Sequence, residues 1–176
     1  MNEELYKKIA NSSAYRASRD ENANEILSNP HLFCDLVAIA LNTSDAHHFK
    51  ACWIMEIVLE QQLFLLTGFL NTFCDQLPHY NNESALRSIS KICLFISQHL
   101  ALSPQQEEQI TESSLDWLID EKRKVATKAY AIRTLFELGK TRKWIYPELK
   151  RILTDDYGKY SAGYQAVAKE IVKKIK

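Results

Sequence analysis

FKACWIMEIVLE, which begins at Phe49, falls into register with two later stretches when the chain is offset by 37 residues. These copies are LRSISKICLFIS from Leu86 and RKVATKAYAIRT from Arg123, and a weaker copy, YSAGYQAVAKEI, begins at Tyr160. A fixed period in this range is typical of stacked helical hairpins. Three columns carry the register: Lys50, Arg87, Lys124 and Ser161; then Cys52, Ile89, Ala126 and Gly163; then Met55, Ile92, Ala129 and Ala166.

The composition agrees with a folded, all-helical chain. Its 176 residues are 46% hydrophobic and 25% charged, and they include only four glycines and four prolines. A sheet protein of this size needs more turns than so few breakers provide. We therefore predict an all-α fold, a right-handed superhelix (solenoid) of about four helical hairpins.

The turn signals divide this single predicted domain, 1–176, into an N-terminal cap and four hairpins. Ser103, Pro104 and Gln106 form the clearest helix start, because a serine N-cap and a glutamine three residues later make a capping box. Gly139 is placed to end a helix in the left-handed conformation. We expect the cap at 1–28, one continuous apolar helix from Leu63 to Gln76, and hairpins at 30–62, 63–100, 103–139 and 143–176.

At these residues the chain resembles the HEAT-like repeat family of α-solenoids. Repeats of that family carry an acid in the turn between two helices and a basic residue early in the second helix. Here Asp45 precedes Lys50, Glu83 precedes Arg87, and Asp120 precedes Lys124, whereas Ser161 fills the basic column of the fourth copy. The resemblance implies a non-enzymatic protein-binding scaffold. It also offers an alternative function, because one branch of the family acts on alkylated DNA.

The basic column is the first candidate binding surface. If the second helices line a concave face, as the resemblance implies, their cations border a groove that would attract an acidic protein or peptide. The same cations could instead pair with the turn acids and set the register between repeats. Both interpretations remain open from the sequence. The predicted groove ladder consists of Lys50, Arg87, Lys91, Lys124 and Lys128.

Charge is segregated along a chain whose net charge is zero, which suggests a second candidate surface. Residues 1–121 contain seven Lys/Arg and 17 Asp/Glu, whereas residues 122–176 contain 15 and five. Aromatic residues among cations can stack on bases, so this half is the alternative, nucleic-acid-binding candidate. Core packing would explain the same aromatics. The predicted patch consists of Arg142, Lys143, Trp144, Tyr157, Tyr160 and Tyr164.

Catalytic and metal-binding patterns are weak. His48, Cys52 and Glu56 share one helical face at spacings of four, but no second helix supplies matching ligands. No phosphate-binding glycine loop or nucleophile elbow occurs, so we predict no catalytic residues, no metal and no cofactor.

The cysteines and the apolar runs indicate in which cellular compartment we expect the protein. All four cysteines lie in predicted apolar helices, and we expect them to be reduced and at least mostly buried. The first residues contain no apolar stretch of signal-peptide length, and no run is long enough to span a membrane. We therefore expect a cytoplasmic protein without a membrane partner.

Overall fold

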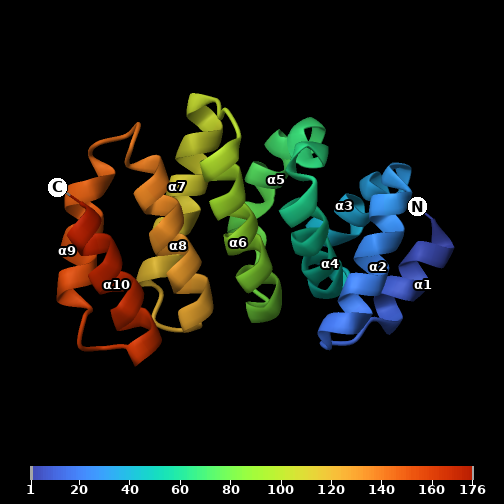
Figure 1. Ribbon diagram of the computed structural model, residues 1–176, viewed down its shortest axis with the longest axis horizontal. Helices are drawn as coiled ribbons and strands as arrows, with labels where there is room; N and C mark the ends of the chain where they lie inside the picture. Colours follow the sequence, from blue (N-terminus) through green and yellow to red (C-terminus); the bar gives the residue numbers. More distant parts are fainter. Residues whose placement is uncertain (1, 176) are drawn as a thin grey trace. The chain divides into compact units, whose positions relative to one another are not determined.

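The computed structural model describes residues 2–175, and this part of the chain is helical without a strand (Figure 1). It divides by internal contacts into two compact units, residues 1–92 and 93–176. The predicted all-α fold is confirmed. The α-helices are α1 Glu3–Asn11, α2 Arg16–Ser28, α3 Phe33–Leu41, α4 His48–Gln61, α5 Leu70–Gln76, α6 Glu83–His99, α7 Pro104–Ile119, α8 Val125–Leu138, α9 Ile145–Asp155 and α10 Ala162–Lys174. Three 3-10 segments, η1 Pro30–Leu32, η2 Leu63–Phe69 and η3 Leu77–His79, complete the described elements.

In the second unit, two helical hairpins stack through their second helices. α7 packs against α8, α9 packs against α10, and α8 contacts α10 of the next hairpin. The apolar stripe of α9 explains its orientation, because Ile145, Leu149, Ile152 and Leu153 recur at helical spacing and are all buried. Such a stack buries each hairpin against its neighbour in the chain.

The first unit begins with a helical hairpin where the sequence predicted a cap. α2 contacts α4, which is the relation that α8 has to α10, and α3 packs against α4 as the first helix of the next hairpin. Lys8 of α1 and Glu25 of α2 form an ion pair of 2.8 Å that ties this first hairpin together. Among residues 2–28, only Leu5, Ile9, Ser12, Asn22, Ala23 and Ile26 are buried, which agrees with the polar sequence of this segment.

One predicted helix start is confirmed in detail. Ser103 Oγ accepts a hydrogen bond from the Gln106 backbone N–H at 3.2 Å, and Gln106 Oε1 accepts one from the Ser103 N–H at 2.9 Å. Together they form a capping box with Pro104 in the first turn. Two backbone donors that the helix leaves without a partner are thereby satisfied.

The predicted left-handed end at Gly139 is wrong. Its φ is −62°, in the right-handed region. A Cβ at this position would lie 2.1 Å from Cε1 of Tyr146. Glycine therefore serves close packing here, since it lets the Tyr146 ring lie against the backbone at the end of α8.

The predicted continuous helix from Leu63 to Gln76 is also wrong. Residues Leu63–Phe69 form a 3-10 segment, and α-helix begins only at Leu70. Thr67 Oγ1 donates to the Phe64 carbonyl at 2.7 Å, and Gly68 follows directly. A glycine weakens a helix interior, and a local side-chain bond competes with helical pairing.

No single helix among residues 2–175 has both the length and the apolar composition to cross a membrane. The segments His48–Gln61 and Leu63–His79 meet these criteria only when joined across a bend of 118°.

Candidate functional site

The three cations of the repeat column lie at different positions relative to the first residue of their helices. Lys50 is the third residue of α4 and Arg87 is the fifth residue of α6. Lys124 instead occupies the N-cap position before α8, with extended φ and ψ of −65° and 148°. Successive residues of an α-helix lie about 100° apart around its axis, so a place in the sequence period does not by itself determine which way a side chain faces in the packed structure. The 37-residue sequence register therefore does not give the five cations equivalent positions on their helices.

Two ladder cations bind a buried carboxylate of the preceding repeat helix. Glu56 of α4, whose side chain is 5% exposed, lies 3.1 Å from Arg87 Nη1 and 3.0 Å from Lys91 Nζ. Ser88 Oγ also donates to Glu56 Oε2. Lys91 Nζ makes a second ion pair, 3.2 Å long, with the more exposed Glu60 Oε2. The partners are thus acids within α4, one repeat earlier, and this network links α4 to the first turns of α6.

Two other members of the predicted ladder bind backbone carbonyls. Lys50 Nζ donates to the Ala10 carbonyl at the end of α1. Lys128 is fully buried, and its Nζ donates to the Leu118 carbonyl near the end of α7. Helix C-terminal carbonyls lack intrahelical partners, so a lysine there acts as a cap. In this structure Lys128 therefore holds α8 against α7 and presents no charge at a surface.

The surroundings of Lys128 are aromatic as well as acidic. Its ammonium lies 4.6 Å from the ring centroid of Tyr160. Burial lowers the pKa of Lys128, while Asp156 and Asp120 oppose that shift. Tyr164, which packs beside Tyr160 at 4.6 Å between ring centroids, has its pKa raised by the same burial. This cluster lies inside the second unit, so the basic residue and its aromatic neighbours support packing there.

The predicted aromatic and basic patch is divided between the two ends of α9. Arg142, Lys143 and Trp144 precede the helix, whereas Tyr157 follows its last residue. Arg142 is engaged by Glu107 at 2.7 Å and by the Pro104 carbonyl at 2.7 Å. Tyr164 is fully buried, but Trp144 and Tyr157 are 55% and 43% exposed. The six residues therefore do not form one surface, and the binding roles predicted for both residue sets remain predictions.

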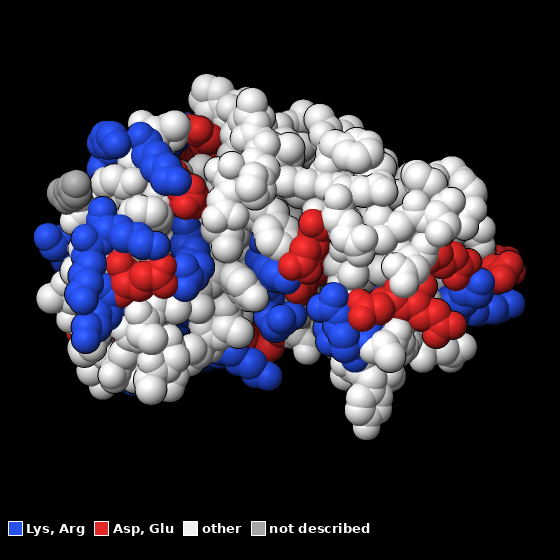
Figure 2. Space-filling view, viewed as in Figure 1, with Lys and Arg blue, Asp and Glu red and all other residues white. Residues whose placement is uncertain are grey.

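Positive charge is concentrated in the second unit. On the face drawn in Figure 2, Lys and Arg gather over α9 and α10, with an acidic group among them. Every acid in residues 122–176 has a cationic partner: Glu137 binds Lys140, Glu148 and Asp155 bind Arg151, Asp156 binds Lys159, and Glu170 binds Arg133 and Lys174. Residues 122–176 contain 15 Lys/Arg but only five Asp/Glu, so these five acids cannot neutralise all the cations of the segment. An excess of this kind favours an anionic partner.

The three residues considered as a metal-binding trio are engaged separately. His48 Nδ1 lies 2.7 Å from the Asp45 carbonyl oxygen, and Cys52 Sγ donates to the Ala40 carbonyl at 3.6 Å. Glu56 serves the network with Arg87.

All four cysteines are free, as predicted, but Cys34 is exposed, so the prediction that it is buried is wrong. Cys34 is the second residue of α3, where the chain turns from the 3-10 segment η1 into the helix. Burial raises the pKa of Cys52 and of Cys74 to about 12. Cys34 is therefore the thiol that reagents reach in the folded protein.

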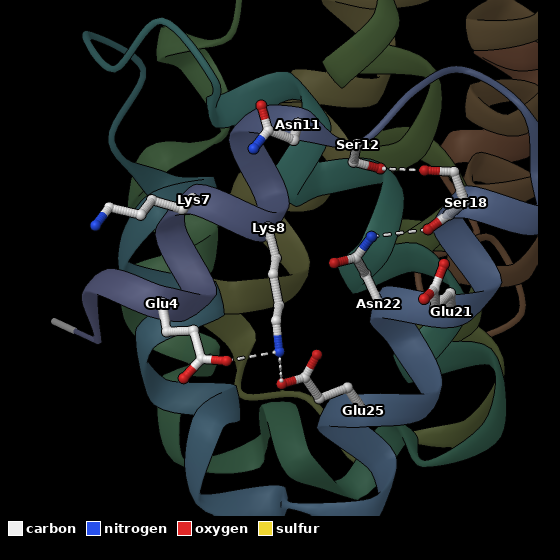
Figure 3. Close-up of a pocket in the computed structure, with 9 residues that line it drawn as sticks. All are labelled: Glu4, Lys7, Lys8, Asn11, Ser12, Ser18, Glu21, Asn22 and Glu25. Carbon is white, nitrogen blue, oxygen red and sulfur yellow. Dashed lines mark hydrogen bonds and ion pairs between the residues drawn. The ribbon is translucent and has the colours of Figure 1, made fainter.

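A polar pocket between α1 and α2 was not predicted. Figure 3 shows Lys8 reaching between Glu4 and Glu25, with ion pairs of 3.0 and 2.8 Å. On the far side, Asn22 donates to the Ser18 carbonyl at 2.7 Å. The pairing raises the pKa of Lys8, chiefly through Glu25. The opposite charges of Lys8 and Glu25 were the sequence signal that could have indicated this pocket, but nothing in the sequence placed α1 and α2 side by side.

One of the comparisons with known proteins agrees with the geometry. No curated protein and no solved structure matches the chain. A family model described as a HEAT repeat domain matches residues 2–175. Since that match covers nearly the whole sequence and the described residues are helical without a strand, this chain belongs to the HEAT repeat family, the all-helical α-solenoid class.

Proposed function

We propose that this protein is a non-enzymatic, cytoplasmic interaction module that binds an acidic protein partner. HEAT repeats commonly mediate protein interactions, and the match extends over residues 2–175. The observation that carries the proposal is the charge of the second unit. Residues 93–176 contain 15 Lys/Arg and 11 Asp/Glu, and every acid after residue 121 is already in an ion pair with a cation of the same unit.

A protein partner agrees better with these contacts than a nucleic acid. Base stacking needs exposed aromatic rings beside free cations. Tyr164 is buried, Tyr160 covers the ammonium of Lys128, and Arg142 is held by Glu107. These contacts use three of the six patch residues for packing, whereas Trp144 and Tyr157 stay exposed, so a nucleic-acid-binding relative of the DNA-alkylation-repair branch is kept as the alternative.

The test is affinity purification with the full-length chain, performed with and without nuclease. We expect a protein that is retained after nuclease treatment and released as salt rises, because exposed charges are screened within about 8 Å at physiological ionic strength. The recovered protein is then purified and its affinity is measured directly. Recovery of nucleic acid alone, or loss of every partner after nuclease treatment, would contradict the proposal and support the alternative.

A further inference from the structure

The outer face of the last hairpin contains a groove that no other part of the described chain fills. Its volume is about 450 Å³, and its floor consists of Leu153 from α9 with Ala168 and Val172 from α10. Tyr157, 43% exposed, follows the end of α9 and lies against one side. The lining is mainly apolar, and the volume is in the range that admits large side chains of a ligand.

Two lysines of α10 lie at this groove. Lys169 and Lys173 line it four residues apart, which places their ammonium groups on the same helical face. Like charges at this spacing repel one another and destabilise a helix. No carboxylate lines the groove, and no described contact pairs either lysine with an acid, whereas neighbouring Lys174 binds Glu170 at 2.7 Å.

A third cation extends this charge along α9. Lys150 is exposed and lies four residues before Thr154 and seven before Tyr157, both of which line the groove. The spacing of four places Lys150 on the same face of α9 as Thr154. The groove thus combines an apolar floor with cations on both of its helices.

We propose that the α9–α10 groove binds an amphipathic helix of a partner protein, with apolar side chains in the groove and acidic side chains against Lys169 and Lys173. This inference rests on the proposed function and assigns it a surface. A helix that presents apolar residues at i, i+3, i+4 and i+7 can insert them along a groove between two helices. Flanking carboxylates relieve the repulsion between the two lysines and set the orientation of the partner.

The first experiment uses the full-length chain and a synthetic probe. The probe is a fluorescein-labelled helical peptide of about 14 residues with leucines at i, i+3, i+4 and i+7 and glutamates on both sides of that stripe. A second peptide has the same leucines and lysines in place of the glutamates. Fluorescence anisotropy should show binding of the acidic probe, weaker binding as salt rises, and at least about tenfold weaker binding of the basic probe.

Variants then locate the site. K169E/K173E should weaken binding of the acidic probe at least about tenfold and improve binding of the basic one. V172E places a charge on the apolar floor and should abolish binding of both. The matched control is K7E/K122E, which makes the same charge change at two exposed lysines outside the groove. Circular dichroism confirms that each variant is folded, and V172T provides a milder polar change if V172E does not fold.

Several outcomes would overturn the inference. Equal binding of both probes, or equal loss with the control and the groove variants, would show that the attraction is not located at α9–α10. Binding to anionic lipid vesicles but not to the acidic probe would identify a membrane surface as the occupant instead. A protein partner recovered by affinity purification whose affinity is unchanged by K169E/K173E and by V172E leaves the proposed function standing and refutes the groove. Failure to recover any protein partner contradicts the proposed function itself.

Discussion

Replacing Glu56 should destabilise the first unit more than replacing any exposed acid of the same helix. Its carboxylate is 5% exposed and accepts bonds from Arg87, Ser88 and Lys91. In E56A the Ser88 hydroxyl, which is fully buried, loses the only acceptor described for it. Leaving such a group without a partner costs about 1–3 kcal/mol.

The ion pairs with Arg87 and Lys91 set the upper limit of the stability lost in E56A. Removing one member of a buried ion pair costs about 3–5 kcal/mol when the remaining charge stays buried. Here Arg87 is 42% exposed and can be hydrated, and Lys91 keeps Glu60 as a partner at 3.2 Å. We therefore expect E56A to lower the free energy of unfolding by about 3 kcal/mol, near the lower end of that range.

The matched control is E60A, one helical turn later. Lys91 is the only ion-pair partner described for Glu60, whose side chain is 45% exposed. Exposed ion pairs contribute about 0–1 kcal/mol, so E60A should change stability by less than 1 kcal/mol. The difference between the two variants isolates burial, because each removes one carboxylate from the same face of α4.

Urea unfolding provides the measurement, followed by circular dichroism and by tryptophan fluorescence. Trp53 lies in α4, three residues before Glu56, so a background in which the other two tryptophans are phenylalanine reports on the first unit. This local probe matters because repeat proteins can unfold in more than one step. A loss of less than 1 kcal/mol in E56A, equal to that in E60A, would refute the view that this network holds α4 and α6 in register.

Three further predictions concern separate parts of the chain. Gly139→Ala should lower stability by about 1–2 kcal/mol in thermal or urea unfolding, because the new methyl group displaces the Tyr146 ring and this outweighs the roughly 0.4–1 kcal/mol that a glycine replacement gains at a compatible φ. Gly68→Ala is the control, since a Cβ there meets nothing within 4 Å, and an equal loss in both variants would contradict the packing argument. A thiol reagent such as DTNB should modify only Cys34 in the native protein and all four cysteines in denaturant, and fast reaction of a second native thiol would show that burial is incomplete. Ion pairs lower the pKa of Glu170 to about 2, so its contribution to stability is present above about pH 4.5 and is lost as pH falls towards 2. Because Glu170 is 36% exposed, Glu170→Gln should cost only about 1 kcal/mol at pH 7 and nothing near pH 2, as measured by urea unfolding at both pH values. An equal cost at both pH values would contradict the assignment.

Several features of the chain follow from its sequence alone. The 37-residue period and the scarcity of glycine and proline predict helical hairpins, because each helix must place an apolar stripe against its neighbours. The capping box of Ser103 and Gln106 was predictable as well, since the bonds it makes span only three residues. Local patterns of this kind depend on short-range geometry that the sequence itself specifies.

The tertiary structure decided which charged groups stay at the surface. Lys124 and Lys128 belong to the same repeat columns as Arg87 and Lys91 in the sequence, but α8 begins after Lys124, and Lys128 is fully buried. The sequence likewise gave no sign that Glu56 would meet cations of α6, a repeat later in the chain. Contacts of this kind depend on the rotation of each helix about its own axis. Successive residues lie about 100° apart around that axis, and the periodic pattern alone does not specify how each helix is rotated against its neighbours.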